Sequence, residues 1–231
     1  MLLHRKSQER GYADHGWLQS YHTFSFAHYY DPDYLNFRSL RVINEDRIRG
    51  GGGFATHSHR DMEIITYVLS GRLEHQDSLG NQALIEPGKI QRMSAGTGIT
   101  HSEYNASETE PVHLLQIWLL PNQTRLPPSY EETFIDLEAS RGQFQTIATP
   151  TGEQDTITIH QNATLSVARL APGERLPLPV ADYAWLQVSK GSVSLGEISL
   201  GQGDGLGISE EENLPFLQGE SESEVLWFNL A

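Results

Sequence analysis

Short apolar runs, separated by polar and turn-forming residues, recur along most of the chain. The runs are rich in Val, Ile, Leu, Tyr and Trp, the breaks contain Gly, Pro, Asn and Asp, and helical periodicity is scarce. This pattern is typical of an antiparallel sandwich or barrel. The clearest predicted strands are residues 62–69, 72–75, 82–85, 112–120, 156–168, 183–188, 192–195 and 225–229.

Turn-forming dipeptides separate several of these strands and support the β assignment. One helix is predicted, over residues 130–139, because Ser129 and Glu132 have the spacing of a capping box and Gly142 would end it. The dipeptides with specific turn chemistry are Ser70-Gly71, Gly80-Asn81, Pro87-Gly88 and Lys190-Gly191.

A weak internal repeat divides the chain into two halves. Residues 66–73 align with residues 186–193 at a constant shift, and both segments are predicted to form a strand, a glycine turn and a second strand. We therefore expect two similar barrels, connected near residues 121–145. The first is placed at residues 1–130 and the second at residues 131–231.

Two pairs of possible metal ligands share a spacing of two residues. His57 and His59 form one pair, and His101 and Glu103 form the other. Residues i and i+2 of a strand point to the same face, so each pair can direct two donor atoms at one ion. Three imidazoles and one carboxylate leave open positions on an ion that accepts five or six ligands, which is typical of catalytic sites.

The spacing alone does not choose the carboxylate ligand. Glu63 has the same parity as His57 and His59, so an unbroken strand would direct it to the same interior as Glu103. The remaining histidines lack such pairing and are expected to be structural, with His22 and His28 near the barrel because of their aromatic neighbours. They are His4, His15, His22, His28, His75, His113 and His160.

A second interpretation of the first pair is a binuclear metallo-hydrolase. Residues 57–62 differ by one position from the His-x-His-x-Asp-His run of those enzymes, with Met62 where the third histidine would stand. A thioether does not replace an imidazole on a hard, water-activating ion. The alternating β-α pattern of those folds is also missing, which disfavours this interpretation.

Composition narrows the function classes. The absence of cysteine excludes disulfides, thiolate catalysis and cysteine-type zinc sites. A net charge of -14 with no basic stripe argues against direct nucleic-acid binding, and the acidic segments 210–212 and 220–224 are expected to be solvated loops. No apolar run is long enough to cross a bilayer and the N-terminus lacks a signal-peptide pattern, so we expect no membrane contact and a cytoplasmic location.

Several segments resemble the two cupin motifs. Gly51, the His57/His59 pair and Glu63 resemble the first motif, although Gly71 comes one residue late; Gly98, His101 and Asn105 resemble the end of the second. More narrowly, the chain is similar to the pirin family, in particular its bacterial quercetin dioxygenase members. That similarity is carried by residues 16–18, 22–27, 29–32, 40–44, 59–68, 93–105 and 116–118.

The resemblance implies an all-β fold of two cupin-type β-barrels, a jelly-roll-like bicupin with little helix. It assigns the metal ligands to His57, His59, His101 and Glu103, and it leaves Glu63 outside the ligand set. Ser58 stands where proline is common in the family. The C-terminal barrel is expected to lack ligands, because the repeat places Pro177 and Pro179 opposite the first histidine pair and no histidine follows His160.

The resemblance also implies an activity: cleavage of a flavonol such as quercetin by O2 with release of carbon monoxide. Glu103 is the expected proton acceptor, and the expected cofactor is one divalent ion, Fe(II) first, with Zn, Ni, Cu, Mn or Co as alternatives. Two other functions stay open at this stage. One is a non-enzymatic metal-binding pirin that acts as a regulatory partner of other proteins, and the other is a metal-free cupin that binds a sugar or an effector.

Overall fold

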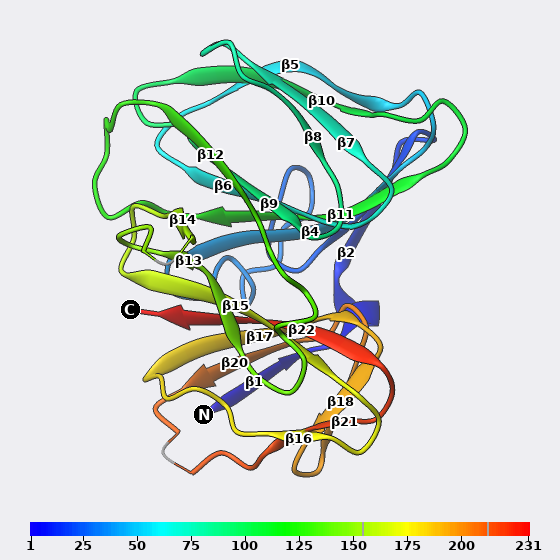
Figure 1. Cartoon of the computed structure of the whole chain (residues 1–231), viewed down its shortest axis with the longest axis vertical. Helices are drawn as coiled ribbons and strands as arrows, with labels where there is room; N and C mark the ends of the chain where they lie inside the picture. The colour runs from blue at the N-terminus through cyan, green and yellow to red at the C-terminus, as the bar shows by residue number, and fades with distance from the viewer. Residues whose placement is uncertain (154, 212) are drawn as a thin grey trace. The chain divides into compact units, whose positions relative to one another are not determined.

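The computed structural model describes residues 1–153, 155–211 and 213–231, which are almost entirely β-structure (Figure 1). Within these residues the only helical element is a short 3-10 turn, η1 (Ser7–Glu9), and none has the length and apolar composition of a transmembrane helix. The all-β prediction is therefore confirmed. Glu212, the last residue of one acidic segment, lies outside the described residues.

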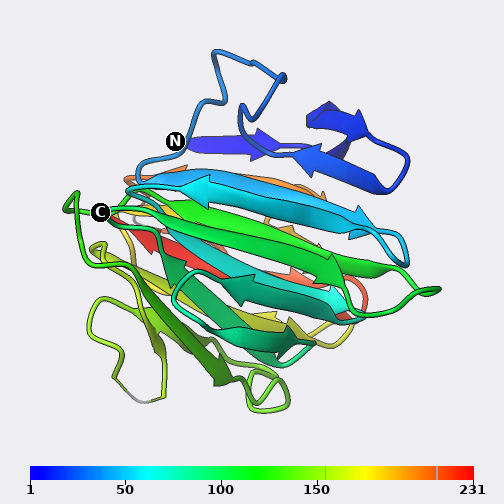
Figure 2. The ribbon, with the colours of Figure 1, turned by 90° about the horizontal axis from the view of Figure 1, so that it is seen from above.

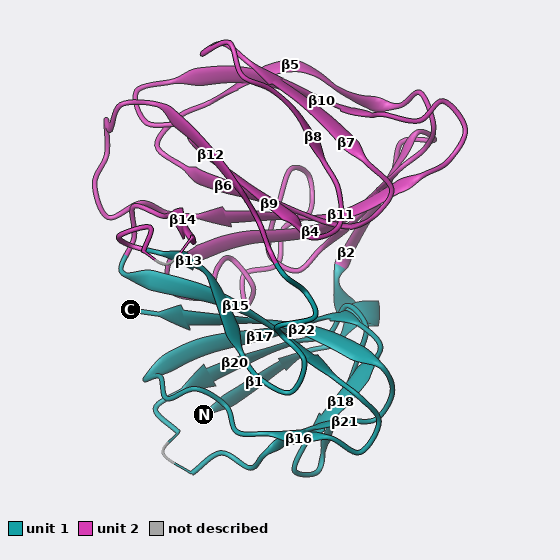
Figure 3. Ribbon diagram, viewed as in Figure 1, with its two compact units in different colours: residues 1–10, 136–149, 162–231 teal, residues 11–135, 150–161 magenta. Residues whose placement is uncertain are grey.

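The chain forms two compact units (Figure 3). Unit 1 contains residues 1–10, 136–149 and 162–231, and unit 2 contains residues 11–135 and 150–161. Each unit takes segments from both sides of residue 130, where the sequence placed the division between barrels. The glycine turns of the internal repeat are present in both units, since Gly71 and Gly191 both have positive φ, at 77° and 70°.

Unit 2 consists of two sheets that face each other in Figure 1. The larger has the order β12-β9-β6-β11-β4-β3-β2 and the smaller the order β5-β10-β7-β8. Their strands, with the short β14 of the same unit, are β2 (Gly11–Asp14), β3 (Leu18–His22), β4 (Leu40–Ile48), β5 (Gly53–His59), β6 (Glu63–Ser70), β7 (Leu73–Asp77), β8 (Gln82–Ile85), β9 (Lys89–Ser94), β10 (Ile99–Asn105), β11 (Val112–Leu119), β12 (Ser129–Phe134) and β14 (Ile157–Thr158).

Burial follows the position of each strand in these sheets. In β10 every second residue from Ile99 to Asn105 is buried, as expected for a strand with one face turned inward. The central strands β6 and β11 are buried almost throughout, and their aliphatic residues form the core. One core cluster joins Leu73 and Ile85 of the small sheet to Ile48 and Leu114 of the large one.

Unit 1 also contains two sheets. One has the order β1-β20-β17-β22-β15-β13 and the other β16-β21-β18-β19, and Trp227 and Leu186 lie in the core of the unit. Their strands are β1 (Leu2–Arg5), β13 (Gln145–Thr149), β15 (Ala163–Leu170), β16 (Arg175–Leu176), β17 (Tyr183–Lys190), β18 (Ser192–Leu195), β19 (Ile198–Gly201), β20 (Gly205–Ser209), β21 (Leu217–Gly219) and β22 (Ser223–Leu230).

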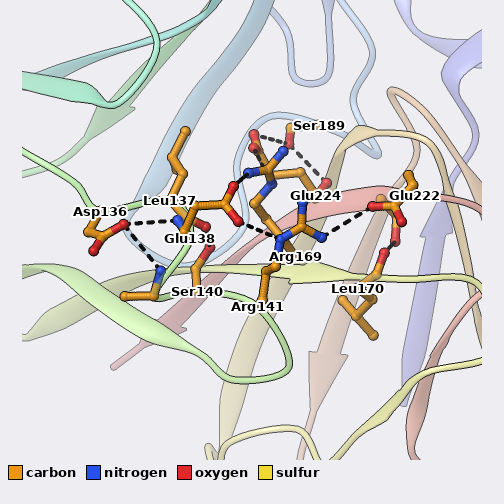
Figure 4. A network of polar contacts seen from close by, with 12 residues as sticks. Asp136, Leu137, Glu138, Ser140, Arg141, Arg169, Leu170, Ser189, Glu222 and Glu224 are labelled. Carbon is orange, nitrogen blue, oxygen red and sulfur yellow. Dashed lines mark hydrogen bonds and ion pairs between the residues drawn. The ribbon is translucent and has the colours of Figure 1, made fainter.

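A polar network fixes the loop at residues 136–142 to the sheet of unit 1 (Figure 4). Glu138 accepts hydrogen bonds from Arg169 of β15 at 2.9 Å and from Arg141 at 2.7 Å. In the same network, Ser189 of β17 donates to buried Glu224 of β22 at 3.0 Å. The network is a structural device, and among the described residues no group of possible metal ligands occurs in unit 1.

The predicted helix over residues 130–139 is wrong. Residues 129–134 form β12, which pairs in antiparallel register with β9, Ser129 opposite Ser94 and Phe134 opposite Lys89. Pairing with an open strand edge outweighs a local capping pattern, because helical propensity is worth only tenths of a kcal/mol per residue. After β12 the chain turns at Asp136, whose carboxylate accepts hydrogen bonds from the backbone N–H groups of Glu138 and Ala139.

Candidate metal centre and cavity

β5 and β10 are neighbouring strands of the small sheet, and their ribbons lie side by side (Figures 1 and 2). Three histidines of these two strands lie close together. The antiparallel register places His101 directly opposite His57 and Ile99 opposite His59. His57 and His59 share a face because they are two residues apart. Between His101 and Glu103 the register shifts, so that Glu103 lies opposite Phe54; such a β-bulge redirects side chains locally.

The three imidazoles are close enough to share one ion. One ring nitrogen from each of His57, His59 and His101 lies within 4.8 Å of the others, and the Nε2 atoms of His59 and His101 are 3.0 Å apart. Two nitrogens at that separation, each about 2.1 Å from an ion, subtend an angle of about 90° at it. Such an angle suits neighbouring ligands of a five- or six-coordinate metal.

The protonation of these histidines also fits a metal site. His57 Nδ1 donates to the carbonyl oxygen of Ala55 at 2.9 Å, so that in the neutral form of the ring the lone pair is on Nε2. Burial, with a smaller effect of His57, lowers the pKa of His59 to about 4. Burial and the neighbouring imidazoles lower the pKa of His101 further. Both rings are therefore neutral at pH 7, as metal ligation requires.

Glu103 lies deeper in the same region. Its side chain is buried, and Gln116 Nε2 donates to both carboxylate oxygens at 3.1 Å, while Thr66 lies 3.3 Å from one of them. Burial raises the pKa of Glu103 to about 7, and the hydrogen bonds from Gln116 and Thr66 oppose that rise. Its role as a fourth ligand stays a prediction, because its carboxylate forms a separate close group with His75 and His101.

His75 was assigned a structural role from the sequence, yet it lies beside the candidate ligands. The register of β7 and β10 places it opposite Glu103, and its ring centroid is 5.3 Å from that of His101. His75 Nε2 is 3.3 Å from Asp77 Oδ2, and Gln91 contacts its Nδ1 at 3.3 Å. His75 and Asp77 have the same spacing of two as the recognised pairs, and that spacing is the signal that could have identified them.

Glu63 is directed elsewhere. Asp61 has a φ of 48°, which breaks the extended chain between β5 and β6, so the parity argument that linked Glu63 to the histidines does not apply. Glu63 is 1% exposed and accepts from Ser94 Oγ at 2.9 Å and from the backbone N–H of His160 at 3.2 Å. These contacts give it a structural role outside both ligand groups.

The metallo-hydrolase interpretation finds no support. Asp61 Oδ1 accepts from the backbone N–H of Arg125 at 2.6 Å, and Met62 packs against an apolar cluster. Neither side chain belongs to a group of possible metal ligands within the described part of the chain.

The candidate ligands border a cavity of about 580 Å³ in unit 2. Aromatic side chains form much of its lining, with Trp118 and Phe26 packed edge to face at 5.4 Å and His59 and Trp118 at 5.0 Å. His22 and His28 line it as well, as expected from their aromatic neighbours. The volume and the aromatic walls suit a flat, mostly apolar molecule.

The large sheet forms one wall of this cavity, and a strip of polar residues crosses that wall. The register places Ser20 of β3 opposite Asp46 of β4, and Asn44 of β4 opposite Gln116 of β11. Burial raises the pKa of Asp46 to about 7; a hydrogen bond from Ser20 opposes the rise, and the charges of Glu103 and Glu45 add to it. Asn44 and Gln116 lie in segments that carry the family resemblance, but no motif in the sequence had assigned a role to this strip.

Comparison with known proteins is consistent with this geometry. The Pirin family matches residues 4–119, and the family described as Quercetinase C-terminal cupin domain matches residues 146–230. The chain belongs to the pirin family. The quercetin 2,3-dioxygenase of Escherichia coli K12 is 46% identical over 232 residues, covering 100% of this chain and 99% of that protein.

Solved structures of similar proteins confirm the fold of two cupin-type barrels. The bacterial pirin YhhW of E. coli, in complex with nickel(II), has a TM-score of 0.93 at 45% identity, with 100% of this chain and 99% of that chain covered. The E. coli protein YhaK has a TM-score of 0.75 at 29% identity, with 95% and 97% covered. The nickel complex and the histidine cluster together support metal binding by this pirin.

Proposed function

We propose that this pirin is a metal-dependent dioxygenase that cleaves a flavonol such as quercetin with O2 and releases carbon monoxide. The observation that carries the proposal is the convergence of three imidazoles at the edge of an aromatic cavity. The name of its 46% identical E. coli relative supports the choice of substrate. The partners of the reaction are a flavonol-like small molecule and O2, and the proposed location is the cytoplasm.

The proposed ligands are His57, His59, His101 and Glu103. Nitrogen and oxygen donors of this kind suit Fe(II), and the same set accepts Ni, Zn, Cu, Mn or Co. When bound, such an ion supplies Lewis acidity toward the 3-hydroxyl and 4-keto oxygens of a flavonol. The hydrogen bond from His57 Nδ1 to Ala55 orients the ring that offers its other nitrogen.

Glu103 is the residue that we assign to accept the 3-hydroxyl proton. Its buried carboxylate lines the same cavity as the three histidines, which supports its assignment as a proton acceptor beside the proposed metal site. Gln116 fixes the carboxylate by donating to both of its oxygens. The apolar walls, Trp118 and Phe26 among them, hold the flat ring system and exclude water from the reacting carbon atoms.

The proposal is tested by aerobic incubation of the Fe(II)-loaded protein with quercetin. We expect loss of flavonol absorbance and formation of carbon monoxide with the wild type, and neither with His101→Ala. A matched control is His113→Ala, which removes a histidine of β11 that contacts Glu45 outside the cavity and should retain turnover. A loaded wild type that leaves quercetin intact contradicts the dioxygenase proposal.

The same preparation addresses the non-enzymatic alternative. A pirin that acts as a metal-dependent regulatory partner would retain its metal and fail to consume any flavonol. A metal-free effector-binding cupin would contain under about a tenth of an equivalent of metal, whereas a tight site gives one equivalent.

A further inference from the structure

Among the non-histidine side chains of the cavity lining, three buried polar atoms have no hydrogen-bond partner within the described residues. They are Asp46 Oδ1, Asn44 Oδ1 and Trp118 Nε1. Asp46 and Asn44 are each 3% exposed. Native proteins leave few such atoms, because a buried polar group without a partner is costly. Their position in a cavity indicates that a ligand supplies the partners.

The two unpartnered oxygens lie side by side on one wall. Asn44 and Asp46 are two residues apart on β4, so both side chains point to the same face of the large sheet. The candidate metal ligands come from β5 and β10 of the small sheet. The candidate metal ligands therefore line the cavity from the small sheet, and the acceptors Asn44 and Asp46, which we call the acceptor wall, line it from the large sheet.

The acceptor wall requires hydrogen-bond donors. An ionised carboxylate only accepts hydrogen bonds, and Ser20 supplies one of them to Asp46. No lysine or arginine is among the described residues that line the cavity. The raised pKa of Asp46 agrees with a carboxylate that the protein alone does not fully stabilise. Hydroxyl groups on an aromatic ligand would supply donors that are compatible with the aromatic walls.

We propose that Asp46, with Asn44 beside it, binds a phenolic hydroxyl of the ligand remote from the metal-binding 3-hydroxyl group. The pair then selects polyhydroxylated flavonols over flavonols that carry the 3-hydroxyl alone. This inference rests on the proposed function for its ligand class. Asp46 is in this sense a specificity-determining residue, and it does not act on the reacting atoms.

The test compares two ligands and does not depend on turnover. Quercetin carries several phenolic hydroxyls, whereas 3-hydroxyflavone carries only the hydroxyl next to the keto group. Their dissociation constants are measured by quenching of tryptophan fluorescence in Ni(II)-loaded protein, without oxygen and at pH 8, where Asp46 is mostly ionised. The quantity of interest is the ratio of the two constants, because effects common to both ligands cancel in it.

We expect Asp46→Ala to reduce the preference for quercetin by about 10-fold, because a hydrogen bond to a charged group is worth at least that factor. The affinity for 3-hydroxyflavone should change by less than about 3-fold. Asp46→Asn keeps the side-chain shape and should reduce the preference by at least about 3-fold, so a folding defect of the alanine variant does not prevent the test.

Glu45→Gln is the matched control, since it changes the neighbouring carboxylate of β4, which contacts His113 and not the cavity. It should leave the ratio unchanged. An unchanged ratio in both Asp46 variants, or equal weakening of the two ligands, overturns the inference.

The outcomes separate this inference from the proposed function. Selective binding that is lost in the Asp46 variants supports the inference even if the Fe(II)-loaded wild type leaves quercetin intact, which contradicts only the dioxygenase proposal. Turnover of quercetin with an unchanged ratio in the variants contradicts only the inference. A wild type that binds neither flavonol contradicts both.

Discussion

Replacing Asp46 by asparagine should stabilise the metal-free protein, and increasingly so as the pH rises. Asp46 is 3% exposed and has one carboxylate oxygen without a partner among the described residues. Burial raises its pKa from 3.8 to about 7. The substitution keeps the shape of the side chain and its hydrogen bond with Ser20, and it removes the buried charge.

The direction of the pH effect on stability follows from the direction of the pKa change. The pKa of the folded state lies above that of the unfolded state, so between pH 4 and pH 7 folding takes up a proton and stability falls as the pH rises. Each pKa unit corresponds to about 1.4 kcal/mol. The cost of Asp46 relative to a neutral residue therefore grows from about 2 kcal/mol at pH 5 to about 4 kcal/mol at pH 8.

Urea unfolding of the wild type and of Asp46→Asn at pH 5 and pH 8 measures this difference. Glu45→Gln is the control, because it neutralises a neighbouring carboxylate that has basic partners: His113 at 2.9 Å and Arg47 at 3.1 Å. That variant should lose about 1–3 kcal/mol. The reasoning is refuted if Asp46→Asn is less stable than the wild type at pH 8, or if its gain in the free energy of unfolding is the same at pH 5 and pH 8.

Two further sets of substitutions test the assignment of the carboxylates. Glu103→Gln should weaken metal binding by about 10–100-fold. Glu63→Gln should change metal binding by less than about 3-fold. It should instead lower the free energy of unfolding by about 2–4 kcal/mol, because Glu63 accepts hydrogen bonds from Ser94 and His160. Chelator competition and urea unfolding measure the two effects, and the reverse ranking would contradict the assignment. Gln116→Leu should reduce metal affinity by about 10-fold at unchanged stoichiometry, since it removes the amide that donates to both carboxylate oxygens of Glu103. Unchanged affinity in the same competition assay would show that Gln116 does not position the carboxylate.

Much of the β-structure follows from local pattern. Residues 82–85 and 192–195 form strands with the predicted bounds, and several others differ by one or two residues at their ends. The long strand predicted at 156–168 is instead two strands, β14 and β15, separated by residues 159–162. The helix predicted at 130–139 failed because the edge of β9, which pairs with β12, is not visible in the local sequence.

The candidate metal site was predictable in part, because a spacing of two residues on a strand is visible in the sequence. It identified His57 with His59 and His101 with Glu103, and the structure brings the three histidines together. The choice between Glu63 and Glu103 was not available from spacing, because the positive φ of Asp61 that breaks the parity is not encoded in any local pattern.

Two polar pairs that the motifs did not reveal also have a spacing of two residues. His75 with Asp77 is such a pair on the buried face of β7, and Asn44 with Asp46 is such a pair in β4, which is buried along most of its length. A strand that buries polar residues on one face must provide them with partners, so such a pair marks either a hydrogen-bond network or a ligand site. His75 is of the first kind, because Gln91 and Asp77 contact its ring nitrogens. Asp46 retains an unpartnered oxygen beside a cavity, and for that reason we assign it to the ligand.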